Sequence, residues 1–351
     1  MIFFAIFIIL WYNVARKKGD IKMNKEILRR YNPKGNTTFS KLSTRDIDLL
    51  LNMLQNYYIS FQNKLNLSRL YSFGFEYECD DIDHFGMGRE FFKRRLYPDY
   101  RIKEEDTVRD GGEIVTPILH NIKTNWKKVE QVLGIIKENS TNSEKCGAHI
   151  HVGSHIMNND QITWENFFMI WSIYEDIITR FLNGEFLNTR LYASEFAKPV
   201  SELFKEVVLS GKLKDIGKKN ELDFHEITVD RYQSVNLNCV HNISREVVND
   251  TIEFRSANGT FNPIIWQNNL NMILHLLLKS SHYSHTILLD RLKREYMDTS
   301  SYSKINITKA LEFADLIFDN NLDKLNFLRQ YFKDFNETKE SCLVKSKPFT
   351  C

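Results

Sequence analysis

The sequence predicts an α+β protein with a mainly antiparallel sheet flanked by helices. Short stretches with the alternating pattern of strands recur along the chain, and stretches with helical periodicity separate them. The helical stretches vary in length and show no regular strand–helix–strand rhythm, which disfavours a parallel sheet built from repeated crossover units. We find no internal repeat and no low-complexity segment.

Four helical regions can be placed from periodicity and capping signals. The first carries Ser43 or Thr44 as a cap and acidic residues in its first turn. The last begins at Pro263, a residue that suits the first helical turn. The predicted helices are residues 43–65, 123–139, 163–182 and 263–297, with at least one further helix after them.

The strand predictions rest on alternation of apolar and other side chains. Residues 71–79 alternate aromatic and other residues, and residues 146–154 alternate again and end near a glycine. Residues 101–119 contain two short strand-like pieces separated by the turn signal Asp-Gly-Gly at 110–112. Residues 231–240 and 251–257 are further strand candidates.

Composition places the chain among globular proteins. Its 351 residues suit about two domains at roughly 150 residues each, or one large α+β domain. Hydrophobic residues make up 42% and charged residues 26%, which excludes a disordered, collagen-like or polytopic membrane protein. A formal charge of +2 predicts no nucleic-acid partner. The five cysteines form no CxxC pair, so we expect neither a disulfide framework nor a zinc knuckle.

The chain begins with a separate hydrophobic segment. Residues 1–12 are almost all apolar, and basic residues follow at 16–18. The run is shorter than the ~20 residues that span a bilayer, and it lacks the cleavage site of a secretory signal. It is either an N-terminal anchor or the result of a start assigned too early, with Met23 as the true first residue. Both readings predict a cytoplasmic body that folds without the segment, with membrane association only if residues 1–15 are an anchor.

The predicted strands contain charged and imidazole side chains, which a strand buried in a hydrophobic core would not normally contain. Residues two apart lie on the same face of a strand, so each pair points the same way. The pairs are Glu76 with Glu78, His149 with His151, and Glu253 with Arg255, and Glu113 follows a glycine pair. Singly, each has an ordinary alternative: an exposed edge-strand face, a pair of hydrogen-bonded histidines, or an exposed ion pair.

Together these residues predict a pocket lined with carboxylates. Such a pocket can hold two divalent ions about 4 Å apart. Carboxylate oxygens favour Mg²⁺ or Mn²⁺, the ions that accompany nucleotide phosphates, and an arginine beside them can stabilise charge on a transferring phosphoryl group. The sequence contains neither GxxxxGK[ST] nor GxGxxG, so metal ions would replace a glycine-rich phosphate loop.

These motifs, in this order, resemble the amidoligase family, which belongs to the glutamine-synthetase-like superfamily of carboxylate–amine ligases. The resemblance runs from about residue 73 to about residue 262, and Arg190 with Tyr192 and the stretch 231–238 resemble secondary motifs of the family. The motifs that carry the resemblance are GFEYE at 74–78, GEIVTP at 112–117, CGAHIHV at 146–152 and TIEFR at 251–255.

The resemblance implies the curved sheet of a glutamine-synthetase catalytic domain and an ATP-dependent ligase that uses two or three Mg²⁺ or Mn²⁺ ions. It also implies roles for individual residues. Glu78 and Glu113 would hold the ion on the acyl-substrate side, and Glu76, His149 and Glu253 would hold the ion on the nucleotide phosphates. Arg255 would neutralise the γ-phosphate, and His151 would support the site or contact substrate. Arg190 and Arg231 would bind phosphate or carboxylate groups.

The expected organisation has four parts, and the resemblance accounts for the catalytic domain among them. A hydrophobic segment at 1–22 precedes a helical region at 23–70, an amidoligase-like catalytic domain at 71–300 and a helical extension at 301–351. The chain departs from the family pattern in a charged, aromatic insertion at 80–106, which affects the substrate side. Imidazole is not a favoured Mg²⁺ ligand, so Mn²⁺ is expected to activate better.

The expected chemistry joins a carboxylate and an amine, with peptides or proteins among the substrates that the resemblance suggests. Asp106 or Glu105 is the candidate base for the amine. Two other functions remain open at this point: a metal-dependent hydrolase that uses the His-x-His motif, and a non-catalytic binding module that retains a metal site. The identity of the acid and the amine is not encoded in any motif.

Overall fold

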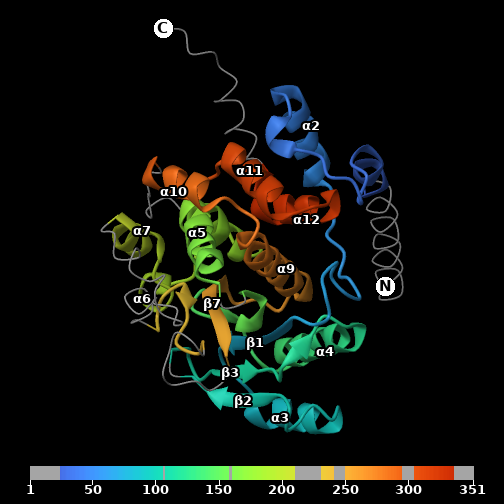
Figure 1. Ribbon diagram of the computed structural model, residues 1–351. Helices are drawn as coiled ribbons and strands as arrows, with labels where there is room; N and C mark the ends of the chain where they lie inside the picture. Colours follow the sequence, from blue (N-terminus) through green and yellow to red (C-terminus); the bar gives the residue numbers. More distant parts are fainter. Residues whose placement is uncertain are drawn as a thin grey trace. The chain divides into compact units, whose positions relative to one another are not determined.

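The computed structural model (Figure 1) describes residues 24–105, 107–157, 160–209, 231–240, 250–294 and 304–335. The hydrophobic segment at 1–22, the alternative start Met23 and the candidate base Asp106 therefore lie outside the described residues. No described helix combines the length and the apolar character needed to cross a membrane.

The chain divides into two compact units. The described residues up to Ser60 and those from Ile305 onward form one unit, and Phe61–Lys304 form the other. The smaller unit is helical: residues 24–30 are helical, and the remaining elements are η1 (Phe39–Lys41), α2 (Thr44–Gln55), α11 (Ile307–Ile317) and α12 (Asn321–Tyr331).

Helix α2 begins where the sequence predicts but ends earlier. The Ser43 hydroxyl accepts from the backbone N–H of Asp46, so Ser43 is the N-cap. The helix stops at Gln55 rather than at residue 65, so the predicted end is wrong. Tyr57 is instead held by α12, because its hydroxyl donates to Asn326 at 2.8 Å and its carbonyl accepts from the Arg329 side chain at 2.9 Å.

Within the described residues, a seven-stranded sheet forms the framework of the larger unit. The strands follow the order β2-β3-β1-β5-β7-β6, with β4 paired to β1, and the strand pairs are antiparallel. The sheet is curved and unclosed and is flanked by helices, so the predicted fold class is confirmed. The strands are β1 (Ser72–Cys79), β2 (Arg101–Glu104), β3 (Gly112–Val115), β4 (Leu119–His120), β5 (Gly147–Gly153), β6 (Val235–Asn236) and β7 (Thr251–Asn258).

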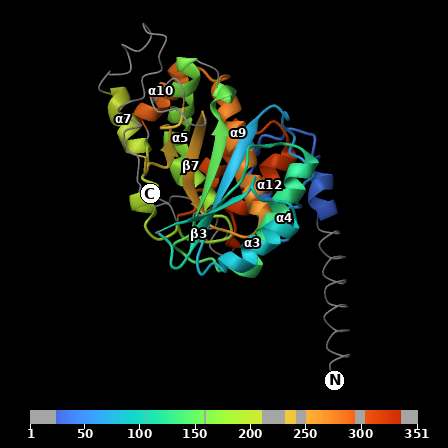
Figure 2. The same ribbon diagram turned by 90° about the horizontal axis from the view of Figure 1, so that it is seen from below.

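Helices bury one face of this sheet in an aromatic core. On β1, the ring centres of Phe75 and Tyr77 lie 4.9 Å and 4.4 Å from the ring centre of Trp266, in edge-to-face geometry. On β7, the ring centre of Phe254 lies 5.5 Å from that of Trp171. Figure 2 shows α5 and α9 beside the strands. The helices of this unit are α3 (His84–Lys93), α4 (Lys123–Asn139), η2 (Ser154–Met157), α5 (Gln161–Leu182), α6 (Ala193–Phe196), α7 (Ser201–Leu209), α9 (Pro263–Ser280) and α10 (His285–Arg294).

Two further predicted elements are shorter than expected. Of the strand predicted at 231–240, only Val235 and Asn236 pair with β7, because the Asn236 side chain accepts from the backbone N–H of Asn238 and turns the chain. The helix predicted at 263–297 breaks after Ser280, where the Ser281 hydroxyl bonds the carbonyl of Leu278, and a second helix, α10, follows. Residues 295–297 lie outside the described residues.

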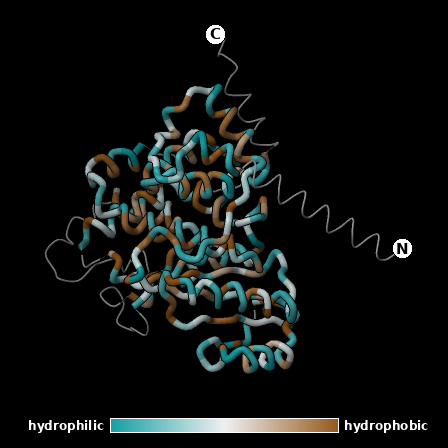
Figure 3. The backbone as a smooth tube through the Cα atoms, turned by 90° about the vertical axis from the view of Figure 1, so that its right-hand side faces the viewer, coloured by the Kyte–Doolittle hydropathy of each residue, from teal (hydrophilic) through white to brown (hydrophobic). Residues whose placement is uncertain are grey.

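Helix α3 lies in the charged insertion at 80–106 and was not predicted. Its N-cap is Asp83, which accepts from the backbone N–H of Gly86 at 2.8 Å. Its buried side chains, Met87 and Phe91, are too few for a clear periodic signal among exposed charged residues. In Figure 3 the lowest part of the trace, which includes α3, is largely teal and therefore hydrophilic.

Candidate active site

The register of four neighbouring strands brings the predicted site residues together. Glu76 on β1 pairs with His149 on β5, and Glu78 pairs with Glu113 on β3. On the far side of β5, His151 pairs with Glu253 of β7. Since Phe75 and Tyr77 face the aromatic core, the alternation of β1 directs Glu76 and Glu78 to the opposite face.

A pocket of about 380 Å³ on that face gathers most of these side chains, and we refer to it as the carboxylate pocket. All five predicted metal ligands line it, together with Arg190, Arg231, Arg255 and the candidate base Glu105. His151 lines a neighbouring pocket of about 710 Å³, the lateral pocket, which shares Glu76 with the first. The predicted metal ligands in the carboxylate pocket are Glu76, Glu78, Glu113, His149 and Glu253.

His149 is the centre of the carboxylate pocket. Its Nδ1 lies 3.2 Å from Glu76 Oε2 and 3.6 Å from Glu253 Oε1, and its Nε2 lies 3.2 Å from Glu78 Oε1. Glu113 Oε1 is 3.9 Å from His149 Nδ1. The His149 side chain is 5% exposed, and its Nε2 forms no hydrogen bond of acceptable geometry. Such an orphaned buried nitrogen, surrounded by carboxylates, fits a site for a cation.

Three of these side chains are spaced as metal ligands. Glu76, His149 and Glu253 each offer one ligand atom, and these atoms lie within 4.8 Å of one another. Ligand atoms that bind one Mg²⁺ at 2.0–2.1 Å are about 3–4 Å apart, so small side-chain movements would close this group around an ion. Glu78 and Glu113 lie beside it and offer oxygens for a second ion.

The titration properties show how strongly the carboxylate pocket favours positive charge. Burial alone would lower the pKa of His149, but the negative charge of Glu78 and the close approach of the Glu76 and Glu78 carboxylates raise it to about 9. Burial would raise the pKa of Glu78, yet His149 and Arg190 lower it to about 2. Burial and the adjacent Glu76 raise the pKa of Glu113. In the metal-free protein a protonated imidazole therefore balances the carboxylates, as a divalent ion could.

Arg190 holds Glu78 in place from the side. Its Nη1 lies 3.4 Å from Glu78 Oε2, and its Nη2 donates to the Arg255 carbonyl at 3.3 Å. The backbone N–H of Gly147 donates to the same Glu78 oxygen. Burial lowers the pKa of the Arg190 guanidinium. Arg190 therefore contacts a predicted metal ligand and is well placed to orient it.

We expect Gly147→Ala to disturb this contact. A Cβ atom at 147 would lie 2.6 Å from Arg190 Nη1 and 2.8 Å from Glu78 Oε2, so both side chains must shift. Overpacking of this kind typically costs about 1–3 kcal/mol. Thermal melting and Mn²⁺ titration should show a less stable protein with weaker ion binding. Gly134→Ala is the matched control, because a Cβ there meets nothing within 4 Å and alanine suits a helix interior.

Arg255 and Glu253 occupy the same wall of the carboxylate pocket. They bond to each other, and Arg255 Nε donates to the Phe196 carbonyl at 3.0 Å. Their side chains are only 16% and 9% exposed, so the alternative of an exposed surface ion pair is wrong. The guanidinium of Arg255 lies 6.0 Å from the centre of the Tyr232 ring, and that of Arg231 lies 4.7 Å from it.

Two residues of this wall had no predicted role. The Asn236 side chain donates to Glu253 Oε2 at 2.6 Å, which fixes the carboxylate, and Tyr232 lies between the two arginines. Both belong to the stretch 231–238 that resembles a secondary family motif, but their residue types carry no chemical signal of their own. Glu105 lines the pocket and accepts from the Thr107 hydroxyl at 2.7 Å.

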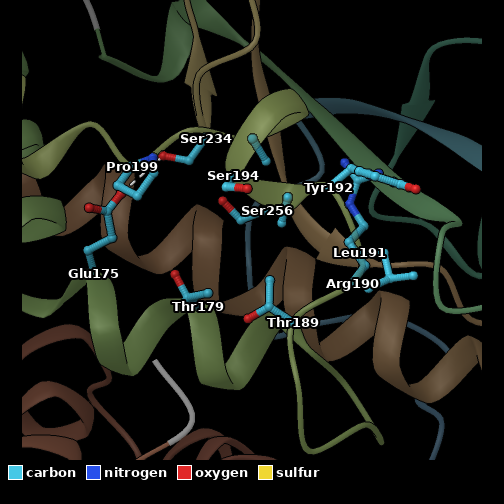
Figure 4. A pocket seen from close by; sticks show the side chains of 12 residues that line it. Glu175, Thr179, Thr189, Arg190, Leu191, Tyr192, Ser194, Pro199, Ser234 and Ser256 are labelled. Carbon is cyan, nitrogen blue, oxygen red and sulfur yellow. Dashed lines mark hydrogen bonds between the residues drawn. The ribbon is translucent and has the colours of Figure 1, made fainter. Parts of the chain in front are cut away.

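A third pocket, of about 420 Å³, shares Arg190 with the carboxylate pocket (Figure 4). The hydroxyl-bearing side chains of Thr179, Thr189, Ser194 and Ser256 line it. At its end the Glu175 carboxylate accepts from the backbone N–H groups of residues 200 and 201, which lie at the start of α7. Glu175 therefore connects α5 to α7, a structural role, and is not part of the metal cluster.

Comparison with known proteins adds one finding. Residues 62–277 match the model of a family described as "Putative amidoligase enzyme". The match covers more than half of the chain, every strand of the sheet and all residues that line the carboxylate pocket. No curated protein matches the chain.

Proposed function

Because this chain belongs to the amidoligase family, we propose that it is an ATP-dependent ligase that joins a carboxylate to an amine through an acyl phosphate. The observation that carries the proposal is the carboxylate pocket. It combines five carboxylates, four of them predicted metal ligands, and a buried imidazole with the guanidinium groups of Arg190, Arg231 and Arg255. The carboxylates and the imidazole suit divalent ions, and the guanidinium groups suit anionic substrates.

The residues present fit Mg²⁺ or Mn²⁺. Glu76, His149 and Glu253 would hold one ion, and Glu78 and Glu113 would hold another. When bound, these ions supply positive charge that screens the phosphate oxygens of ATP. The imidazole among the ligands favours Mn²⁺ over Mg²⁺ as the better activator.

In the first step a carboxylate oxygen of the acid attacks the γ-phosphorus of ATP. The bond from that phosphorus to the bridging oxygen breaks, and ADP leaves with its electron pair. Arg255, held in direction by the Phe196 carbonyl, neutralises the charge on the transferring phosphoryl group. Arg190 and Arg231 bind the carboxylate or phosphate oxygens. His151, in the lateral pocket, supports Glu76, because its Nε2 lies 3.3 Å from Glu76 Oε1.

In the second step the amine nitrogen attacks the acyl carbon. The carbon–oxygen bond to phosphate breaks, inorganic phosphate leaves, and the amine loses a proton. Glu105 lines the carboxylate pocket and is our candidate acceptor for that proton. We propose that the acid and the amine include groups on peptides or proteins, and that the protein acts in the cytoplasm without nucleic acid.

Trapping of the acyl phosphate tests this function. The protein is incubated with ATP, Mn²⁺ and a panel of amino acids, dicarboxylic acids and peptides, with hydroxylamine in place of the amine. We expect at least one acid to yield an iron-coloured hydroxamate and to release phosphate in equal amount, and we expect neither product without ATP. Cleavage of an amide without ATP would instead identify a hydrolase. Binding of Mn²⁺ with no product from ATP across the panel would favour the non-catalytic module.

A further inference from the structure

The insertion at 80–106 presents an aromatic and basic surface that the proposed chemistry does not use. Phe85 and Phe92 on α3 are 81% and 77% exposed, and Tyr97 just after the helix is 67% exposed. Arg89 lies between the two phenylalanines in sequence, and Arg95 follows the helix. We refer to Phe85, Arg89, Phe92, Arg95 and Tyr97 as the α3 patch.

Spacing places the core of the α3 patch on one side of the helix. Phe85, Arg89 and Phe92 are separated by four and three residues, so their side chains form one stripe. The opposite side of α3 is occupied, because Met87 and Phe91 are buried. The exposed stripe is therefore the solvent-facing side of α3, and the side that packs on the core is a different one.

Among the residues that the structure describes, the two arginines of the α3 patch take part in no ion pair. Glu90 pairs with Lys93 at 2.7 Å and approaches Arg94 at 4.0 Å. Arg89 and Arg95 form no ion pair with any acidic side chain among the described residues. Exposed aromatic rings beside unpaired guanidinium groups are the residue types that dominate the binding energy of protein interfaces. A cluster of this kind on a soluble surface usually marks an interaction site.

The chain that carries the α3 patch reaches the lateral pocket at Pro98. Tyr97 is bonded to Pro98, which lines that pocket, and the pocket leads to the metal cluster through Glu76. The lateral pocket carries both signs of charge. Its charged and titratable side chains are Glu76, Asp99, Arg101, Lys103, His151, His155 and Asp250.

We propose that the α3 patch binds an acidic, aromatic-containing polypeptide segment and directs it along the lateral pocket to the metal cluster. Carboxylates of the segment pair with Arg89 and Arg95, and its apolar side chains pack on Phe85, Phe92 and Tyr97. A polypeptide fits better than a bilayer, because a bilayer cannot enter a pocket. That the bound segment is a substrate rests on the proposed ligase function.

Binding of a labelled acidic polypeptide tests the α3 patch without any catalytic step. The probe is a fluorescein-labelled random copolymer of Glu and Tyr, measured by anisotropy with the full-length protein and no ATP. We expect Phe85→Ser with Phe92→Ser, and separately Arg89→Glu with Arg95→Asn, to weaken binding about tenfold or more. Asparagine suits position 95, where φ is +55°. A copolymer of Lys and Tyr should bind poorly.

Matched controls lie elsewhere on the larger unit. Ile287→Ser removes another exposed apolar side chain, and Lys128→Glu reverses another exposed charge; neither should change binding.

Equal binding by the patch variants, or no binding by the wild type, would overturn the proposal. Patch-dependent binding of phosphatidylserine vesicles or oligothymidylate but not of the copolymer would assign the α3 patch to a membrane or a nucleic acid instead. A failed hydroxamate assay with intact copolymer binding would refute the ligase function alone.

Discussion

Glu76→Gln should abolish stabilisation of the protein by Mn²⁺ while leaving the metal-free protein folded. Glu76 contacts both histidines, with His149 Nδ1 at 3.2 Å and His151 Nε2 at 3.3 Å, and belongs to the group of three ligands. Glutamine keeps the volume and one acceptor oxygen but removes the negative charge. Since loss of an outer-shell partner already costs about 10–100-fold in metal affinity, loss of a direct ligand should cost more.

Thermal melting at rising Mn²⁺ concentration measures this effect. A ligand at 100 times its Kd stabilises the folded state by about 2.7 kcal/mol, so the wild-type melting temperature should rise clearly. The variant should show almost no rise. Glu130→Gln on α4 is the control, because its exposed carboxylate does not line the carboxylate pocket and the rise should persist. An equal rise in the Glu76 variant would remove Glu76 from the metal site.

Arg255→Lys should lower kcat by about 10²–10³ and change ATP binding much less. The guanidinium of Arg255 reaches the carboxylate pocket in a fixed direction, because its Nε donates to the Phe196 carbonyl. Lysine keeps the charge but not the planar fork that contacts a transferring phosphoryl group. Loss of one contact made in the transition state typically costs that factor in rate.

ATP turnover, ATP affinity and thermal melting of the lysine variant separate the roles of Arg255. If the residue only paired with Glu253, the rate would stay near that of the wild type, or would fall in step with unfolding. Arg109→Lys serves as the control, since Arg109 pairs with Asp81 at the surface, where its side chain is 71% exposed, and should leave turnover unchanged. An unaltered kcat in a folded Arg255 variant would contradict the proposed contact.

Alternation along strands explains why much of the site could be predicted from sequence. A strand places residues two apart on one face, so Glu76 with Glu78, and Glu253 with Arg255, could be assigned to common faces without knowledge of the fold. The same local rule located β1, β5 and β7 to within a few residues. The helix α4 was located fully, because its apolar positions recur with helical spacing over 17 residues.

Contacts between distant parts of the chain could not be predicted in this way. The pairing of Glu76 with His149 depends on β1 and β5 being neighbours, which no local pattern encodes. The bond from Asn236 to Glu253 arises because two residues of β6 pair with β7. Asparagine is common in turns, so its sequence context indicates a turn and not a role in the site.

In the insertion at 80–106, neither the helix nor the exposure of its aromatic residues could be predicted from the sequence. Its composition of aromatic and basic residues was visible in sequence, but α3 was not, because Met87 and Phe91 alone make its inward face. Exposure of Phe85 and Phe92 is a property of the folded chain, since a sequence pattern would place phenylalanines inside.

Anomalous diffraction from crystals grown with Mn²⁺ and a non-hydrolysable ATP analogue tests the central claim most directly. The account predicts a manganese peak bonded to Glu76, His149 and Glu253, a second beside Glu78 and Glu113, and analogue phosphates that bridge them within reach of Arg255. Manganese at other residues only, or an analogue bound away from the carboxylate pocket, would contradict it.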